Sequence, residues 1–264
     1  MRSFCRTFPV AVVLLMVLAG FTQAEQPPDS PPLTTDQIVR KLMGANVRRA
    51  EALRGYTAKR NYHIDYTGWF GHRTADMQVE VTYTAPDKKD FRIISQSGST
   101  LLINRILLRL LKSESDAQED ENRKGLEVTS DNYNFALDQV EQVSGSDSYV
   151  LKVAPKGKNR YLYRGKIWVD ARDFAVARME GEPQKNFSMW ASHSNVAYRW
   201  FRQDGFWLPI HTQSDSQVRM GGKITLTIDY SDYQLSTGTR LANERGPNQH
   251  EIVPSPTAVT ADPP

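Results

Sequence analysis

The sequence predicts a mainly β protein of the α+β class, built on one long antiparallel sheet of about ten strands. Three runs, 77–83, 149–153 and 224–230, alternate apolar and polar residues with a period of two. This period is typical of strands with one buried and one wetter face. Turns containing Asp or Gly separate successive runs, and helical periodicity occurs in two places. Strands joined by hairpins with few helices between them indicate a single antiparallel sheet.

The expected strands fill most of the chain after its first helix. The turns at 170–173, 204–205 and 221–222 lie between β-branched or aromatic residues, so residues 161–235 are expected to form a meander. A sheet of this length must curl, split or close. The strands are expected near residues 56–66, 75–85, 90–96, 131–136, 148–154, 161–170, 174–181, 187–202, 206–219 and 223–235.

An amphipathic helix is expected to open the domain. Thr34 forms a capping box with Gln37 three residues later, and Gly55 is expected to end the helix. Apolar residues recur between these two signals at helical spacing. They are Ile38, Leu42, Met43, Val47, Ala50 and Leu53.

The two ends of the chain differ in composition from this core. Residues 1–24 carry two arginines, an apolar run and a small-residue site ending at Ala24, which predicts a cleaved secretory signal peptide. An exported chain without cysteine fits a bacterial periplasm. The remainder is expected to form a Pro-rich linker, one domain and a disordered Pro-rich tail, at residues 25–33, 34–236 and 237–264.

Charge and cysteine content exclude several classes of function. The chain has 33 Lys and Arg residues, which fall to 31 when Arg2 and Arg6 leave with the signal peptide, against 30 acidic residues. Such a balanced chain lacks the basic excess of a nucleic-acid-binding surface, so no nucleic-acid partner is expected. Cys5 is the sole cysteine and lies in the signal peptide. The mature chain therefore has no disulfide, thiolate nucleophile or Cys-ligated zinc.

No catalytic motif stands out. Gly-x-Ser-x-Gly is absent, and no two histidines lie four residues apart beside a glutamate. His63 and Asp65 share a strand face and allow a metal or acid–base site, but their alternation with apolar residues favours a solvent-facing pair. Asp170 and Asp173 lie in a turn, where Asp caps backbone amides. We therefore expect no enzyme activity, no metal and no cofactor.

A second helix is expected in the middle of the chain, at 99–112. It gathers Arg105, Arg109 and Lys112 onto one stripe, with leucine and isoleucine around the rest of its surface. Three interpretations stay open: a core helix that crosses the sheet, a lid that an apolar ligand displaces from a cavity, and a helix that binds a membrane surface.

A cluster of acidic residues follows this helix. It is expected in a solvated loop, or alternatively in a docking patch for a basic partner. Its members are Glu114, Asp116, Glu119, Asp120 and Glu121.

Aromatic residues mark the extent of the core. All those of the mature chain lie between Tyr56 and Tyr233, which indicates a single core. Tyr198 and Trp200 share one strand face, and Phe201 takes the other. Bulk on both faces indicates that both are partly covered, or that one lines a cavity.

Several strand-and-turn motifs resemble a known family. Residues 165–181 and the preceding run 149–156 resemble the outer-membrane lipoprotein-sorting proteins, the LolA-like superfamily of periplasmic lipoprotein carriers. Shorter segments at 55–58, 206–210 and 227–233 are also similar to that family. The resemblance implies a half-open, strongly curved, barrel-like antiparallel sheet. It also implies helices in the concavity, which enclose an apolar cavity for acyl chains.

The resemblance also implies a function. The expected protein is a non-enzymatic periplasmic carrier or binder of lipoproteins or lipids, whose acyl chains displace the mid-chain helix. The alternative is a periplasmic regulatory module that senses lipid and acts on a protein partner. Expected partners are acyl chains and a membrane transporter or acceptor protein, and the chain is expected to be a monomer. Residues expected in the cavity or lid are Leu101, Leu102, Ile106, Leu107, Leu110, Val79, Val81, Tyr83, Leu151, Ile167, Val169 and Trp200.

Overall fold

The structure is a computed structural model that describes most of the chain between residues 33 and 238. The expected signal peptide, the linker as far as residue 32 and the tail beyond Gly238 lie outside the described residues. The elements discussed below belong to the unit that begins at Thr34. No helix within the described residues is both long and apolar enough to cross a membrane. The described stretches are 33–69, 71–86, 88–116, 127–143, 145–157, 162–184, 191–219 and 221–238.

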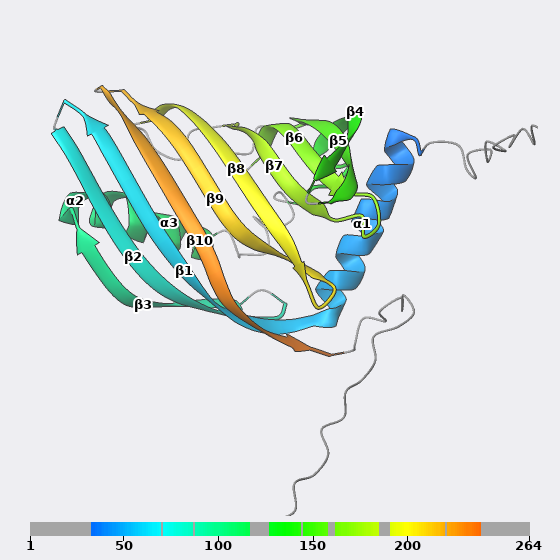
Figure 1. Cartoon of the computed structure of the whole chain (residues 1–264), viewed down its shortest axis with the longest axis horizontal. Helices are drawn as coiled ribbons and strands as arrows, with labels where there is room; N and C mark the ends of the chain where they lie inside the picture. Colours follow the sequence, from blue (N-terminus) through cyan, green and yellow to red (C-terminus); the bar gives the residue numbers. More distant parts are fainter. Residues whose placement is uncertain are drawn as a thin grey trace, which may run out of the picture. The chain divides into compact units, whose positions relative to one another are not determined.

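Ten strands form one antiparallel sheet in the order β3-β2-β1-β10-β9-β8-β7-β6-β5-β4 (Figure 1). Neighbours in the sheet are neighbours in sequence except where β1 pairs with β10. The expected mainly β fold and the meander are therefore confirmed, and the sheet stays open, with β3 and β4 as its edges. The strands are β1 (Leu53–Gly68), β2 (Gly71–Thr84), β3 (Lys88–Gly98), β4 (Tyr133–Val143), β5 (Ser146–Pro155), β6 (Tyr163–Asp170), β7 (Val176–Pro183), β8 (Ala191–Gln203), β9 (Phe206–Val218) and β10 (Gly222–Thr237).

Strand β4 extends well beyond its expected end near residue 136. The register shifts between Leu137 and Gln139, and most side chains after this bulge are exposed. A bulge moves the following side chains to the other face of the strand, and an edge strand has a partner on one side alone. The second half of β4 therefore lacks the alternation that reveals a strand in sequence.

Helix α1 (Thr35–Ala52) begins at the expected capping box. The backbone N–H of Gln37 donates to Thr34 Oγ1 at 3.3 Å, and the N–H of Thr34 donates to Gln37 Oε1 at 2.8 Å. The expectation that Gly55 ends the helix is wrong, because the chain enters β1 at Leu53. Gly55 instead allows close pairing of β1 with β2: a Cβ there would lie 2.6 Å from the carbonyl oxygen of Tyr83.

The buried face of α1 differs in part from the expected one. Ile38 and Leu42 are buried, but Val47 is 56% exposed and Ala50 is also exposed. The guanidinium of Arg49 lies on the buried side, where it donates to the carbonyl oxygens of Asp173 and Phe174, each at 3.0 Å. A search for apolar periodicity overlooks this contact because its central residue is charged.

The turn between β6 and β7 shows the expected role of Asp170. Its Oδ1 accepts hydrogen bonds from the backbone N–H groups of Arg172 at 2.9 Å and Asp173 at 2.8 Å. The carboxylate of Asp173 accepts from Trp207 Nε1 at 3.0 Å and also binds Arg202. Asp170 therefore caps backbone amides of the turn as expected, whereas the carboxylate of Asp173 links the turn to side chains of β8 and β9.

The mid-chain helix is continuous but irregular. It consists of α2 (Thr100–Leu102), a π-helical segment η1 (Ile103–Leu107) and α3 (Leu108–Asp116). It therefore runs four residues past the expected end at Lys112 and takes in Glu114. A π-helical turn inside a helix is rare and has an identifiable cause.

The cause lies in a repeat of four residues. Apolar residues recur at this spacing in two rows, Leu102–Ile106–Leu110 and Ile103–Leu107–Leu111. Four residues overshoot an α-helical turn of about 3.6 residues, so each repeat drifts around the helix by roughly 40°. The wider π-helical turn absorbs this drift. Leu102, Leu107 and Leu111 therefore all face the sheet, at 3%, 0% and 8% exposure.

Candidate functional site

The mid-chain helix packs on one face of the sheet, here called the inner face. Its apolar rows form a single buried cluster with side chains of β1, β2 and β10. Figure 1 shows the helix lying alongside these strands, which bend along their length. The strand residues at the centre are among the least exposed of the described chain. They include Tyr62, Ile64, Met77 and Val79, at 0–2% exposure.

The inner face continues across the sheet beyond the helix. Cross-strand partners point to the same side, so a row of paired residues defines this face from β1 to β5. The row runs through Tyr62, Ile228, Thr212, Tyr198, Met179, Ile167 and Leu151.

The expected site residues fall into three groups along this face. Under the helix, the apolar cluster brings together Leu102, Ile106, Leu107, Leu110, Val79 and Val81. Tyr83 lies at the margin of this region, with its ring 5.2 Å from that of Tyr56. Leu101 points away from the sheet and is 59% exposed. In the four-residue repeat, Leu101 belongs to a row with Arg105 and Arg109, beside the two apolar rows and not within them.

The second group lies toward the other end of the inner face. Leu151, Ile167 and Val169 are 0–1% exposed on β5 and β6, outside the cluster that the mid-chain helix covers. The third group is Trp200 alone, half-buried on β8, with its ring stacked 5.8 Å from that of Tyr198. The structure thus brings together half of the expected residues. Of the others, Leu101 faces outward on the helix, Tyr83 lies at the margin of the cluster, and the remaining four lie on β5, β6 and β8.

Between these apolar regions, the inner face of β8 and β9 carries hydroxyl groups. Ser194 Oγ lies 2.8 Å from Ser216 Oγ, and Tyr163 OH lies 2.9 Å from Tyr198 OH. Burial raises the pKa of Tyr163 to about 12, so the phenol stays neutral and can donate a hydrogen bond. The inner face therefore changes from apolar to polar and back to apolar across the sheet.

A buried cluster of charges attaches the mid-chain helix to the sheet. Glu114 accepts hydrogen bonds from Arg60 Nη1 at 2.6 Å and Nη2 at 3.1 Å, and from Lys89 Nζ at 3.0 Å. Arg60 is 5% exposed, with its guanidinium over the rings of Phe91 and Tyr230, at 5.7 and 5.2 Å. A two-point guanidinium–carboxylate contact fixes geometry as well as charge.

The expectation that Glu114 belongs to a solvated acidic loop is therefore wrong. Glu114 continues the row Leu102–Ile106–Leu110 by one further repeat, which turns it toward the sheet. Arg60 occupies an inward position of β1 between Ala58 and Tyr62. One acid in an apolar helix row and one base in an apolar strand row are unusual in the sequence, but neither pattern shows that the two residues pair. The other acids lie at the end of α3 or outside the described residues: Asp116, Glu119, Asp120 and Glu121.

The pKa of Glu114 sets the pH range over which this cluster contributes stability. Burial raises the pKa, but the charges and hydrogen bonds of Lys89 and Arg60 outweigh burial and lower it to about 2. A carboxyl whose pKa is lower in the folded chain stabilises the fold above its unfolded pKa and loses this effect as pH falls through its folded pKa.

We therefore expect the contribution of Glu114 to be complete above about pH 4.5 and to disappear toward about pH 2. Urea unfolding across this range, with the wild type compared with Glu114→Gln, measures it. The free energies of unfolding of the two proteins are expected to converge as the pH falls. A constant difference between them would contradict the assigned ion pair.

His63 and Asp65 remain solvent-facing, as expected, but each pairs with a residue of β2. His63 does not pair with Asp65: its Nδ1 lies 2.7 Å from Asp76 Oδ1, and Asp65 Oδ2 lies 2.7 Å from His72 Nε2. Both pairs are exposed cross-strand contacts. Among the described residues, no group of three His, Cys, Asp or Glu side chains could hold a metal ion.

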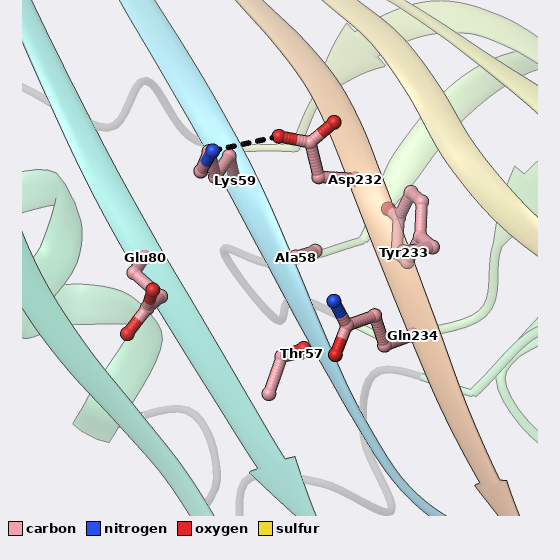
Figure 2. Close-up of a pocket in the computed structure, with 7 residues that line it drawn as sticks. All are labelled: Thr57, Ala58, Lys59, Glu80, Asp232, Tyr233 and Gln234. Carbon is pink, nitrogen blue, oxygen red and sulfur yellow. Dashed lines mark ion pairs between the residues drawn. The ribbon is translucent and has the colours of Figure 1, made fainter. Parts of the chain in front are cut away.

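A pocket of about 330 Å³ with a mixed polar and apolar lining lies on the opposite face of the sheet (Figure 2). It lies beside the register shift between Thr57 and Lys59, where β1 and β10 pair irregularly. Lys59 Nζ and Asp232 Oδ2 form an exposed ion pair of 2.9 Å across it. The ion pair and the polar side chains beside it suit an acyl chain less well than the apolar cluster under the mid-chain helix does. The lining residues are Thr57, Ala58, Lys59, Glu80, Asp232, Tyr233 and Gln234.

A search of family models and of curated proteins finds no match to this sequence. Several solved structures are similar to the chain. An outer membrane lipoprotein-sorting protein domain from Vibrio parahaemolyticus has 13% identity, with 77% of this chain and 94% of that chain covered and a TM-score of 0.42. A LolA superfamily protein from Nitrosomonas europaea has 14% identity, coverage of 78% and 94%, and a TM-score of 0.35. The MucA/MucB complex from Pseudomonas aeruginosa has 11% identity, with 72% of this chain and 94% of that chain covered and a TM-score of 0.22. These TM-scores are low, so we derive the function from the geometry of this chain.

Proposed function

We propose that this chain is a non-enzymatic periplasmic binder or carrier of lipids or lipoproteins, whose acyl chains replace the mid-chain helix on the inner face. The observation that carries the proposal is the contact between this helix and the sheet. Its two apolar rows pack against apolar side chains of β1, β2 and β10, as an acyl chain would. The same surface is thus apolar, continuous and occupied by a segment of the chain itself.

The attachment of the helix suits a displaceable segment. At its N-terminus, Ser99 N–H donates to the carbonyl oxygen of Thr74 at 2.8 Å, directly after Gly98. Gly98 has φ of +87°, and a Cβ there would lie 2.5 Å from the same carbonyl oxygen. This junction stays tied to β2 while the remainder of the helix is held by side chains. Release of the helix then breaks its apolar contacts and the Glu114 cluster. It breaks no hydrogen bonds between strands.

One acyl chain offsets a large part of the cost of displacing the helix. A buried methylene contributes about 0.8 kcal/mol, so an acyl chain of about twelve methylenes contributes roughly 10 kcal/mol before ordering costs. Exposing a buried leucine costs about 1.5–3 kcal/mol. One such chain therefore offsets the exposure of about four of the six apolar side chains that the two helix rows place against the sheet.

The matched variants Leu107→Gln/Leu110→Gln and Leu101→Gln test the binding surface. Replacing the inward pair places amides that an acyl chain cannot satisfy beside the ligand. We expect the double variant to lose co-purifying lipid and the outward Leu101 variant to retain it. Mass spectrometry of organic extracts from protein purified out of the native envelope measures the lipid.

Thermal unfolding of both variants is the control, because their lipid contents can be compared only if each variant is folded. A folded double variant that retains the wild-type amount of lipid would contradict the proposed surface. Lipid transfer to acceptor vesicles separates a carrier from the alternative, a lipid-sensing regulatory module. A carrier releases its cargo, whereas a sensor retains it and changes its affinity for a protein partner.

A further inference from the structure

The outward side of the mid-chain helix is as regular as its buried side. The four-residue repeat produces two exposed rows, Leu101–Arg105–Arg109 and Asn104–Leu108–Lys112. Leu101 is 59% exposed and Leu108 is 37% exposed. Each row thus combines leucine with at least one cation. We call this surface the outer helix face.

Between Thr100 and Ser113, the charged residues of the outer helix face are all basic. The sequence from Thr100 to Ser113 contains Arg105, Arg109 and Lys112 and no acidic residue. Glu114, the first acid after them, turns inward to Arg60 and Lys89. Asp116, four residues after Lys112, is the last residue of α3. The packing that buries the inner rows therefore also presents three cations and two leucines outward.

We propose that the outer helix face binds the surface of a membrane that contains anionic phospholipid. Amphipathic helices at membrane interfaces place leucine at the boundary of the acyl chains and cations at the phosphates. The mixing of leucine and cations within each row fits this partner better than an acidic protein, which would match the charges but not the exposed leucines. The inner and outer faces are separate, so this binding does not depend on the proposed acyl-chain site.

Vesicle co-sedimentation of the full chain tests the proposal. The probes are phosphatidylcholine vesicles with and without phosphatidylglycerol, each at low and high salt. We expect binding to the anionic vesicles alone and weaker binding in high salt, because exposed charges are screened. Each cation near an anionic surface contributes about fivefold to binding.

Two variants with the same loss of charge separate a local surface from net charge. Arg105→Gln/Arg109→Gln/Lys112→Gln removes the outer cations, and Arg40→Gln/Arg48→Gln/Arg164→Gln removes three exposed cations elsewhere. We expect the first to bind anionic vesicles roughly a hundredfold more weakly and the second to bind as the wild type does. Thermal unfolding is expected to change little in either, since these side chains are exposed.

Equal binding by the two triple variants would overturn the proposal, as would equal binding to vesicles with and without phosphatidylglycerol. The variant Leu101→Ser/Leu108→Ser is expected to weaken binding while preserving its salt dependence, and unchanged binding would overturn insertion of the leucines. Binding to polyglutamate through the same cations, without binding to vesicles, would contradict the membrane and indicate an acidic protein partner. Loss of the acyl-chain site would leave all these results unchanged.

Discussion

Replacing Glu114 with alanine is expected to lower the free energy of unfolding by about 3–5 kcal/mol, because Arg60 then stays buried without its carboxylate. Arg60 is 5% exposed and donates two of the three hydrogen bonds that Glu114 accepts. Lys89→Ala is the control: it leaves the Arg60–Glu114 pair intact, so a smaller loss is expected. Urea unfolding at neutral pH measures both.

The double variant Arg60→Met/Glu114→Leu separates the cost of an unpaired charge from the contribution of the pair. Replacing a whole buried ion pair with apolar residues of similar size is often neutral or stabilising. We therefore expect the double variant to be more stable than Glu114→Ala. A Glu114→Ala protein as stable as the wild type would show that the helix is not held by this cluster.

Leu107→Ala is expected to lower the free energy of unfolding of the lipid-free protein by about 2–5 kcal/mol, as for other leucines cut from a packed core. Leu107 is fully buried against the inner face. The control Leu101→Ala changes an exposed leucine of the same helix and is expected to cost less than about 0.5 kcal/mol.

Bound lipid is expected to reduce the cost of Leu107→Ala, since Leu107 has then already left the sheet. Measuring the variant and the wild type with and without lysophosphatidylcholine shows this difference. A cost that is the same in both states would make Leu107 a permanent part of the core.

The sheet could be predicted from sequence because its signals are local. Each of the ten expected strands corresponds to one observed strand, since alternation and turn residues lie within the strand and turn that they specify. The errors arose where a distant contact decides the outcome. Gly55 has the sequence signature of a helix end, but its role is set by the carbonyl of Tyr83 on β2. Arg49 of α1 bonds to a turn more than a hundred residues later.

The apolar part of the candidate site was predictable, and its charged part was not. The leucine and isoleucine rows of the mid-chain helix are visible as a pattern, and six expected residues meet in one cluster. Glu114 stands beside other acids in sequence, which suggests a solvated segment. Its inward direction depends on the π-helical turn and on its pairing with Arg60, which lies 54 positions earlier. Such pairing becomes visible only when the strand and the helix are packed together.

Hydrogen exchange of residues 100–116, with and without lysophosphatidylcholine, tests the displacement of the mid-chain helix most directly. This zwitterionic lipid supplies one acyl chain and no net charge, so its effect does not involve the outer helix face. Bound lipid is expected to accelerate exchange throughout η1 and α3, while amides of β1 and β2 stay protected. If lipid binds and exchange of these residues stays as slow as in the lipid-free protein, the helix is a fixed part of the core and acyl chains do not replace it.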